Sequence, residues 1–368
     1  MLAAMETQGH QPSDDPRESE RLLAFAELAL NNGSPAEALA AFAQLRGTGA
    51  RSGEARALEA LGRNDEAAAL HRRLWERTPP GTVERAEHAT GMVRCHRLHD
   101  DVTTAVRLGE TALGEFGEHR HAWHGAAVRL GVTLAGALTA LGELSCSQYL
   151  LNRLAAVADT LGEPASRGAV RWNASLNAHL LGRPVAAYRL SMQALALFGE
   201  TDLPRHLAVV RGIHGRMIAR AYPDRWREGL DLVLRSAAEL SELGQGDWLV
   251  DTETEAAEIL VRADRPAQAL PHLYSALARP QQAESLVKAD THLVLAEALA
   301  ALGDTDGCAA EVATAAAMLG SRGRRHSQLA REWHRTAALY RHLGDPARAL
   351  RAYEHALVAA GHGGPVWG

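Results

Sequence analysis

The stretch RHLGDPARAL, residues 341–350, contains the pattern that decides the fold of this chain. A run of helix-forming residues ends at Leu343, Gly344 follows it, Pro346 opens the next run, and Ala349 stands five positions after the glycine. Glycine suits the left-handed backbone that ends many helices, and proline is tolerated in a first helical turn because its missing N–H has no partner there. The stretch therefore predicts two helices joined by a tight turn.

The same pattern recurs along the chain at nine turn residues, each a glycine or an aspartate. They are Gly33, Gly62, Asp100, Gly142, Gly182, Asp224, Asp264, Gly303 and Gly344. The residue five positions later is always small: Ala38, Ala67, Ala105, Ser147, Ala187, Gly229, Ala269, Cys308 and Ala349. Antiparallel helices approach closely near a tight turn, so only a small side chain fits there. After a shorter first unit, the turns lie about 40 residues apart.

A second marker falls between the turns, where a glycine follows a large apolar residue. These glycines are Gly117, Gly162, Gly199, Gly244 and Gly320. We expect each to end a helix in the left-handed conformation, so that one unit is a helix, a tight turn, a second helix and a glycine stop. A single hairpin of this kind cannot bury its apolar stripe, and neighbours must stack into a solenoid. A plain helical bundle is the alternative, and nine turns in phase disfavour it.

The composition agrees with close-packed helices. Hydrophobic residues make up 46% of the 368 residues and aromatic residues only 5%, and the chain is rich in alanine and poor in the residues that strands favour. The net charge of -5 argues against direct nucleic-acid binding. Three scattered cysteines indicate a reducing cytoplasm, and the sequence shows neither a signal peptide nor an apolar stretch long enough for a membrane.

Two further columns make the units similar to the tetratricopeptide repeat (TPR), whose consensus has 34 residues. Seven positions before the turn stands a small residue: Ala55, Ala135, Ser175, Ala257, Ala296 and Ala337. Four positions before it stands a large apolar residue: Leu58, Leu138, Leu260, Leu299 and Tyr340. Met217, Arg220 and His96 depart from these columns, and the units are longer than the consensus. The resemblance implies an all-α, right-handed superhelical solenoid of about nine TPR-like hairpins.

The stretch AREWHRTAALYRHLGDPARALRAYEHALVAAG, residues 330–361, looks like the end of the sensor region of actinobacterial Xre-type helix-turn-helix transcriptional regulators. This resemblance implies a non-enzymatic sensor of a peptide, a partner protein or a small effector, linked to transcriptional regulation. The chain leaves no room for a helix-turn-helix before Glu20, so we expect no direct nucleic-acid binding by this chain. We predict a disordered polar tail over 1–18, one solenoid over 19–361 and a C-terminal tail over 362–368.

In the family that the chain resembles, side chains on the concave face lie about 13, 10, 6, 3 and 2 residues before the turn. The resulting predicted binding residues are Arg129, Trp172, His179, Arg211, His214, Asp251, Thr254, Glu258, Glu297, Arg331 and His334, with Asn173 and Asn177 beside Trp172. Their alternating charges suit an extended peptide or protein segment. The alternatives are that these residues merely solvate the concave face, or that the chain is a general scaffold for protein-protein interaction.

The sequence contains no catalytic motif. Lys288 is the single lysine and does not stand in a phosphate-binding loop, and zinc-protease and nucleophile-elbow motifs are absent. Cys95 and His99, with His121 and His124 of the next helix, form a candidate metal site and the basis of a third alternative, a metal-dependent enzyme. Cys95 also stands where small residues pack, and we prefer this structural interpretation. We therefore predict no enzyme, no metal and no cofactor.

Two remaining features concern surfaces. A loop carries Arg322, Arg324, Arg325 and His326, which suits either solvation or contact with an anion. The last predicted helix, 346–360, offers an apolar stripe of Leu350, Tyr353 and Leu357 that no later helix covers. Terminal repeats normally have a polar outer face, so we expect either Val366 and Trp367 or a second copy of the chain to cover this stripe.

Overall fold

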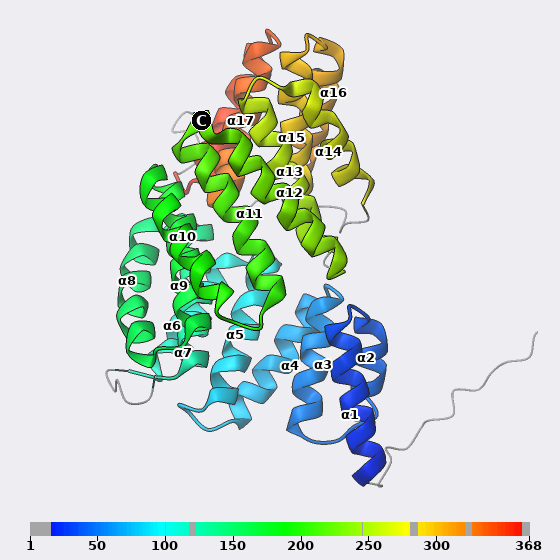
Figure 1. The fold of residues 1–368 in the computed structure, drawn as a ribbon, viewed down its shortest axis with the longest axis vertical. Helices are drawn as coiled ribbons and strands as arrows, with labels where there is room; N and C mark the ends of the chain where they lie inside the picture. Colours follow the sequence, from blue (N-terminus) through cyan, green and yellow to red (C-terminus); the bar gives the residue numbers. More distant parts are fainter. Residues whose placement is uncertain are drawn as a thin grey trace, which may run out of the picture.

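The computed structural model describes residues 16–99, 101–117, 123–244, 246–279, 286–320 and 326–362. These residues form eighteen α-helices and one short 3-10 helix, and no strand occurs among them. Figure 1 shows the helices winding into a superhelix, as the repeat pattern predicts. No helix in these ranges is both long enough and apolar enough to cross a membrane.

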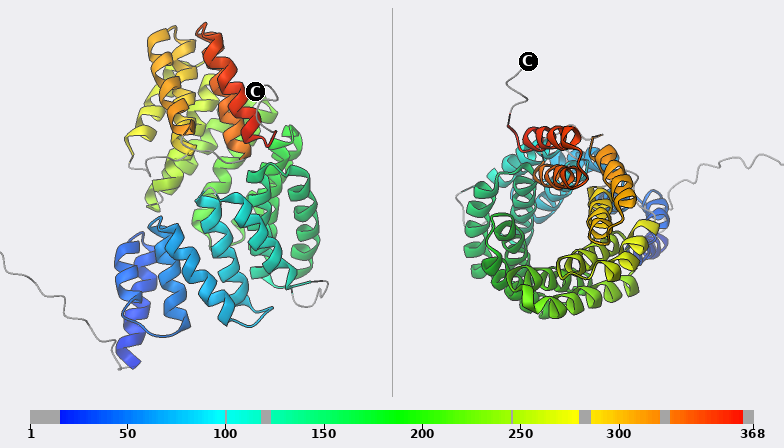
Figure 2. Two further views of the ribbon diagram at one scale, coloured as in Figure 1. Left: turned by 180° about the vertical axis from the view of Figure 1, so that it is seen from behind. Right: turned by 90° about the horizontal axis from the view of Figure 1, so that it is seen from above.

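The helices pair in chain order into nine antiparallel hairpins. They are α1 (Pro16–Asn31) with α2 (Pro35–Phe42), α3 (Thr48–Ala60) with α4 (Asn64–Arg77), α5 (Val83–Leu98) with α6 (Val102–Gly114), α7 (Gly125–Leu141) with α8 (Leu144–Leu161), α9 (Pro164–Leu180) with α10 (Pro184–Gly199), α11 (Pro204–Ala221) with α12 (Trp226–Glu242), α13 (Gly246–Arg262) with α14 (Pro266–Ala278), α15 (Leu286–Ala301) with α16 (Thr305–Gly320), and α17 (Ser327–His342) with α18 (Pro346–Ala359). The odd-numbered helices line the inside of the superhelix and the even-numbered ones form its outer wall (Figure 2).

The small residues beside the turns hold each hairpin together. All nine residues five positions after the turn are buried, and so are the six small residues seven positions before it. The two columns touch each other: the Ser147 hydroxyl donates a hydrogen bond to the Ala135 carbonyl at 3.0 Å, and the Ser175 hydroxyl donates one to the Ala187 carbonyl at 2.8 Å. The predicted close approach of the two helices is therefore present, and it explains why alanine is so abundant.

Most of the predicted turn residues adopt the left-handed backbone. Gly33, Gly62, Gly142, Gly182, Gly303 and Gly344 have φ angles between 71° and 90°, and Asp264 has φ 58°. Asp100 lies outside the described residues. The glycines that end the second helices behave less uniformly than expected, because Gly117, Gly162 and Gly244 are left-handed whereas Gly199 and Gly320 are not. These two are the last residues of α10 and α16, so each glycine still belongs to its helix.

The sixth hairpin departs from the predicted register. Its expected turn residue, Asp224, lies in the 3-10 helix η2 (Pro223–Arg225), which lengthens the connection between α11 and α12. Counted from Tyr222 instead, Gly215 and Ile218 occupy the small and the large apolar columns that Met217 and Arg220 seemed to break. Both Gly215 and Ile218 are buried. The register of α11 is thus displaced by two residues, and this changes which of its side chains face inward.

Successive turns of the superhelix touch each other. The Ser327 hydroxyl at the start of α17 donates a hydrogen bond of 2.7 Å to the carbonyl of Thr139 in α7, across 188 residues of sequence. The turn at Gly33 lies beside the carbonyl of Gly244, which follows α12. The fourth hairpin therefore meets the ninth, and the helices between them wind around a common axis, as Figure 2 shows from above. We refer to the inward-facing surface of the odd-numbered helices as the channel.

The two ends of the array refine the expected boundaries. Helix α1 begins at Pro16, so the predicted tail over 1–18 loses its last three residues to the solenoid. On α18, Tyr353 packs against the core, whereas Leu350 and Leu357 are 61% and 55% exposed. Val366 and Trp367 lie outside the described residues, as do Arg322, Arg324 and Arg325. Cys95, Cys146 and Cys308 are all free thiols.

Candidate functional site

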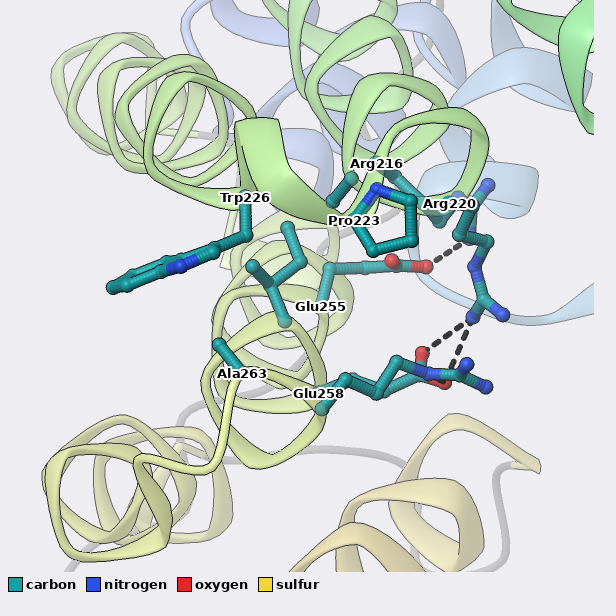
Figure 3. Close-up of a pocket in the computed structure, with 10 residues that line it drawn as sticks. Arg216, Arg220, Pro223, Trp226, Glu255, Glu258 and Ala263 are labelled. Carbon is teal, nitrogen blue, oxygen red and sulfur yellow. Dashed lines mark hydrogen bonds and ion pairs between the residues drawn. The ribbon is translucent and has the colours of Figure 1, made fainter.

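The inner channel is lined by ion pairs between neighbouring odd-numbered helices. Arg220 on α11 holds the Glu258 carboxylate of α13 with two hydrogen bonds of 2.8 and 2.7 Å, and Arg262 reaches the same carboxylate at 3.1 Å. Arg216, one helical turn before Arg220, pairs with Glu255. These side chains line a pocket between α11 and α13, together with Pro223 and Trp226 (Figure 3).

A second group of charges continues along the channel from α15 to α17. The Arg335 guanidinium pairs with Glu297 at 2.9 Å and with Asp290 on α15, and with Glu332 on its own helix at 2.8 Å. Glu332 is fully buried and also forms an ion pair of 2.8 Å with Arg331. A carboxylate at such a site needs more than one cationic partner to offset its lost hydration. The network therefore fixes α15 and α17 to each other.

The enclosed channel shifts the pKa values of its titratable groups. Burial raises the pKa of Glu258, but Arg220 and the three other nearby arginines outweigh it and hold this pKa at about 2. Burial, followed by the charges of Arg220 and Arg216, lowers the pKa of His179 to about 3. Burial raises the pKa of Asp251. Near neutral pH, Glu258 is therefore ionised and His179 is a neutral imidazole.

Two polar atoms in the wall of the pocket have no partner. Arg216 Nε and Glu255 Oε2 are both buried, and neither makes a hydrogen bond to any of the described residues. Buried donors and acceptors are nearly always satisfied in folded proteins, by protein atoms, by water or by a ligand. The pocket therefore has one free donor and one free acceptor, which suits a ligand with complementary polar groups such as a peptide.

Five of the predicted residues belong to this channel. His179, Asp251 and Glu258 lie close enough for their pKa values to respond to the same inner arginines. Glu297 and Arg331 belong to the second group of charges. The residue offsets of the resembled family therefore bring together side chains from α9, α13, α15 and α17.

Three predicted residues are not accessible from the channel, and their placement has to be corrected. Asn177 is 0% exposed and its amide donates to the Leu144 carbonyl at 3.2 Å, which ties α9 to α8. Thr254 is 2% exposed and shares a 2.8 Å hydrogen bond with Thr291. His214 is 7% exposed and shares a 2.9 Å hydrogen bond with Ser191. These polar groups connect neighbouring helices, and we leave them out of the site.

Arg211 also needs correction. Its guanidinium pairs with Glu239 on the outer helix α12, a carboxylate that Arg235 reaches as well. The two-residue displacement of α11 explains where the structure places His214 and Arg211. It directs their side chains towards neighbouring helices and brings Arg216 and Arg220 to the channel. The sequence carried a signal for this displacement, since the sixth hairpin is the only one of the last six in which both columns are broken, by Met217 and Arg220.

The four remaining predicted residues take no part in the two groups of charges. Trp172 is half-buried, packs edge-on against Phe198 at 6.3 Å and lies 6.5 Å from Trp248, measured between ring centroids. Asn173 donates to the carbonyl of Ala169 in its own helix at 3.0 Å. The exposed residues are Arg129, which pairs with Glu87 at 3.2 Å, and His334, whose ring lies 5.4 Å from that of Tyr353. Trp172 thus contributes to packing between α9, α10 and α13.

Arg94 and Arg97 on α5 were not among the predicted residues, although the sequence could have identified them. They stand six and three positions before Asp100, at the same offsets that select Glu258 and His179 in their own hairpins. Applying the offsets to every turn residue would have included them. The Arg94 side chain pairs with Glu59 on α3 at 2.5 Å.

The structure does not bring the candidate metal ligands together. Cys95 is buried in the core beside Leu58, and burial raises the pKa of its thiol to about 12. His99 is exposed and lies 3.8 Å from Asp65. His124 accepts a hydrogen bond from the backbone N–H of Ala127 and packs against Phe116. His121 lies outside the described residues, and the described part of the chain contains no cluster of three or more residues suited to holding a metal ion.

Comparison with known proteins identifies the fold. No protein-family model and no curated protein matched the sequence. Among solved structures, the chain is similar to a Rap protein in complex with Competence and Sporulation Factor, with TM-score 0.59 and 10% identity over 93% of this chain and 97% of that one. It is also similar to NprR in complex with its cognate peptide NprX, with TM-score 0.58 and 12% identity over 97% and 91%. Human IFIT1 with m7Gppp-AAAA gives TM-score 0.52 and 14% identity over 94% and 83%.

These identities are low, so the similarity establishes the architecture. The structural neighbours are repeat proteins of the TPR type, and the chain shares their all-α superhelical fold along almost its whole length.

Proposed function

We propose that this chain is a non-enzymatic regulatory module that binds a peptide, or an extended segment of a partner protein, in its inner channel. The observation that carries the proposal is the pocket between α11 and α13, where the charged wall leaves Arg216 Nε and Glu255 Oε2 buried without partners. A peptide backbone offers both the acceptor and the donor that these atoms lack. A small effector that carries one hydrogen-bond donor and one acceptor would satisfy the same two atoms, and it is the alternative ligand under this proposal.

The pattern of charge along the channel favours an extended ligand. Arginine pairs with glutamate at successive positions from α11 to α17, so that a chain lying along the channel meets both signs in alternation. Electrostatic complementarity of this kind fixes the register and direction of a bound segment. Two of the proteins with a similar fold were solved with ligands, the Rap protein with Competence and Sporulation Factor and NprR with its cognate peptide NprX. Their ligands make a peptide the first class to test here.

A regulatory role linked to transcription would pass through a partner. The resemblance of residues 330–361 to regulator sensor regions motivates this link, and the chain would transmit ligand binding to a separate DNA-binding protein. We place this function in the cytoplasm, where free Cys95, Cys146 and Cys308 would stay reduced. A second copy of the chain on Leu350 and Leu357 of α18 is a further proposal, and the molar mass in solution tests it.

A general protein scaffold is the second candidate function. Met192, Leu234 and Tyr274 are exposed at equivalent positions of the outer helices α10, α12 and α14. A partner bound there would occupy the outer wall and would not enter the channel. The location of the bound partner therefore distinguishes a scaffold from a sensor.

The experiment uses a synthetic mixture of random heptapeptides, passed over the immobilised protein and identified by mass spectrometry. The variant Arg216→Gln with Glu255→Gln removes the charges of this one ion pair in the pocket but keeps hydrogen-bonding groups. The matched control is Arg63→Gln with Glu66→Gln, which removes an ion pair at the start of the outer helix α4.

We expect the wild type and the control to retain the same subset of peptides and the pocket variant to lose it. A pocket variant that retains the same subset as the wild type would contradict the proposal, and so would a wild type that retains none.

A further inference from the structure

The pocket between α11 and α13 has an apolar part besides its ion pairs. Arg216 pairs with Glu255 and, one turn further along both helices, Arg220 pairs with Glu258. Because the partners follow in the same order on the two helices, α11 and α13 run side by side in the same direction. The apolar part of the wall extends to the ends of both helices and consists of Ala219, Pro223, Trp226, Ile259 and Ala263.

The apolar residues of the wall come from three helices. Ala219 of α11, Trp226 of α12 and Ile259 of α13 pack in one core cluster. Figure 3 shows Trp226 and Ala263 on one side of the pocket and the ion pair between Arg220 and Glu258 on the other. A ligand that carries a polar and an apolar group next to each other would match both sides.

The sequence accounts for the space at the end of α13. Five hairpins have a leucine immediately before the turn residue: Leu61, Leu141, Leu181, Leu302 and Leu343. In the seventh hairpin this position is occupied by Ala263. Leu141 and Leu343 each pack against a core that their own hairpin shares with the preceding one. The shorter side chain of Ala263 therefore leaves space towards the sixth hairpin, and the pocket lies there.

The size of the pocket suits a single side chain. Its volume is about 350 Å³, including the part that is open to solvent, which is at the lower end of the range for ligand pockets. A peptide is much larger than this space. One residue of a bound peptide would therefore enter the pocket, and the others would lie along the channel.

We propose that this pocket binds one aliphatic side chain of the peptide, of about the size of leucine, against Trp226, Ile259 and Ala263. The backbone of the same residue meets Arg216 Nε and Glu255 Oε2, which have no partner among the described residues. This inference rests on the proposed function and specifies the ligand as a peptide with leucine, isoleucine, valine or methionine at one position. The ligand thus supplies the apolar group that the seventh hairpin lacks.

The chemistry of the pocket favours an aliphatic group over a charged one. Burial of an aliphatic side chain stabilises a complex in proportion to the apolar area removed from water. A charged side chain would lose its hydration against the apolar wall. It would also compete with ion pairs that are already formed, since Arg216 holds Glu255 and Arg220 holds Glu258.

The test compares two random heptapeptide mixtures, one complete and one made without leucine, isoleucine, valine and methionine. The proteins are the wild type, Ala263→Leu and a control, Asn32→Leu. Ala263→Leu gives the seventh hairpin the leucine that five others carry, and its side chain fills the pocket. Asn32→Leu places a leucine at the same position of the first hairpin, immediately before Gly33, and this position does not line the pocket.

We expect the wild type and Asn32→Leu to retain aliphatic peptides about tenfold better than peptides of the second mixture, with the aliphatic residue at one common position. Ala263→Leu should lose this preference but retain the second mixture as the wild type does, because Arg216 and Glu255 are unchanged. If Ala263→Leu keeps the preference, or loses both classes of peptide equally, the subsite is overturned. A wild type that retains peptides without this preference overturns the subsite but not the proposed function, and one that retains no peptide overturns both.

The thermal midpoint shows whether the variant is folded. We expect Ala263→Leu to melt no lower than the wild type, because a leucine at this position packs against the preceding hairpin in the way that Leu141 does. If its midpoint is lower, Ala263→Val takes its place and, since valine fills less of the pocket, should reduce the aliphatic preference in part. An unchanged preference in Ala263→Val would then overturn the subsite.

Discussion

A Cβ atom built on Gly229 would lie 2.5 Å from the carbonyl oxygen of Gly215, so neither of these facing residues can carry a side chain without a shift of the backbone. In the sixth hairpin they occupy the positions that Ala135 and Ser147 occupy in the fourth hairpin, and Ser175 and Ala187 in the fifth. The hairpin with the displaced register therefore makes, with two glycines, a contact that other hairpins make with alanine and serine.

The first prediction concerns the stability of this contact. Gly229→Ala should lower the free energy of unfolding by about 1–3 kcal/mol, because overpacking a close backbone approach outweighs the gain in helix propensity. Gly199→Ala is the control, since a Cβ there meets nothing within 4 Å and its backbone is not left-handed. Urea denaturation followed by circular dichroism measures both. Equal stability of the two variants would show that α11 and α12 can separate without cost.

The sequence predicted the array well because its determinants are local. The left-handed turn glycine and the small residue after it, such as Ala187, both depend on residues of a single hairpin. Both predictions are confirmed at most turns. The site was harder, because the 3-10 turn at Pro223–Arg225 displaced α11 by two residues and exchanged Arg211 for Arg216. The Ser327–Thr139 contact lay beyond sequence reasoning, since it joins hairpins whose separation depends on the small rotation accumulated at every repeat.

The second prediction distinguishes the two registers of α11. Arg211→Gln should leave retention of the peptide mixture unchanged, because Arg211 pairs with Glu239 on the outer helix. Arg220→Gln should reduce retention, because Arg220 positions Glu258 in the pocket. Binding is measured by mass spectrometry at equal protein loading. If Arg211→Gln reduced retention and Arg220→Gln did not, the register of α11 counted from Asp224 would be the correct one.

The third prediction concerns pH. The pKa of His179 falls from 6.5 in the unfolded chain to about 3 in the folded one, so only the unfolded state binds this proton as the pH drops below 6.5. Stability should therefore decrease from pH 6.5 towards pH 3, with a contribution of at most about 1.4 kcal/mol per pH unit from this residue. The pKa of His88, which burial and then His71 lower to about 4, adds a second contribution of the same sign.

His179→Gln tests this dependence, because it removes the proton that the unfolded chain binds at this residue. We expect a shallower decline of the unfolding free energy between pH 6.5 and pH 4 than in the wild type. The exposed His99→Gln serves as the control and should reproduce the wild-type slope. The carboxylate of Glu258 adds its own loss only below about pH 4.5, where the unfolded chain begins to bind its proton, because its folded pKa is about 2. A slope in His179→Gln identical to that of the wild type would contradict the assignment.

The fourth prediction concerns the contact between superhelical turns. Ser327→Ala removes the hydrogen bond to the Thr139 carbonyl and should cost about 0.5–1.5 kcal/mol, the usual contribution of one neutral hydrogen bond. Because this bond joins α17 to α7 and not to a neighbouring hairpin, its loss should also widen the superhelix, which small-angle X-ray scattering detects as a larger radius of gyration. Thr111→Ala is the control, since Thr111 bonds only to Arg107 in its own helix. An unchanged radius in Ser327→Ala would mean that packing within the hairpins alone sets the pitch of the superhelix.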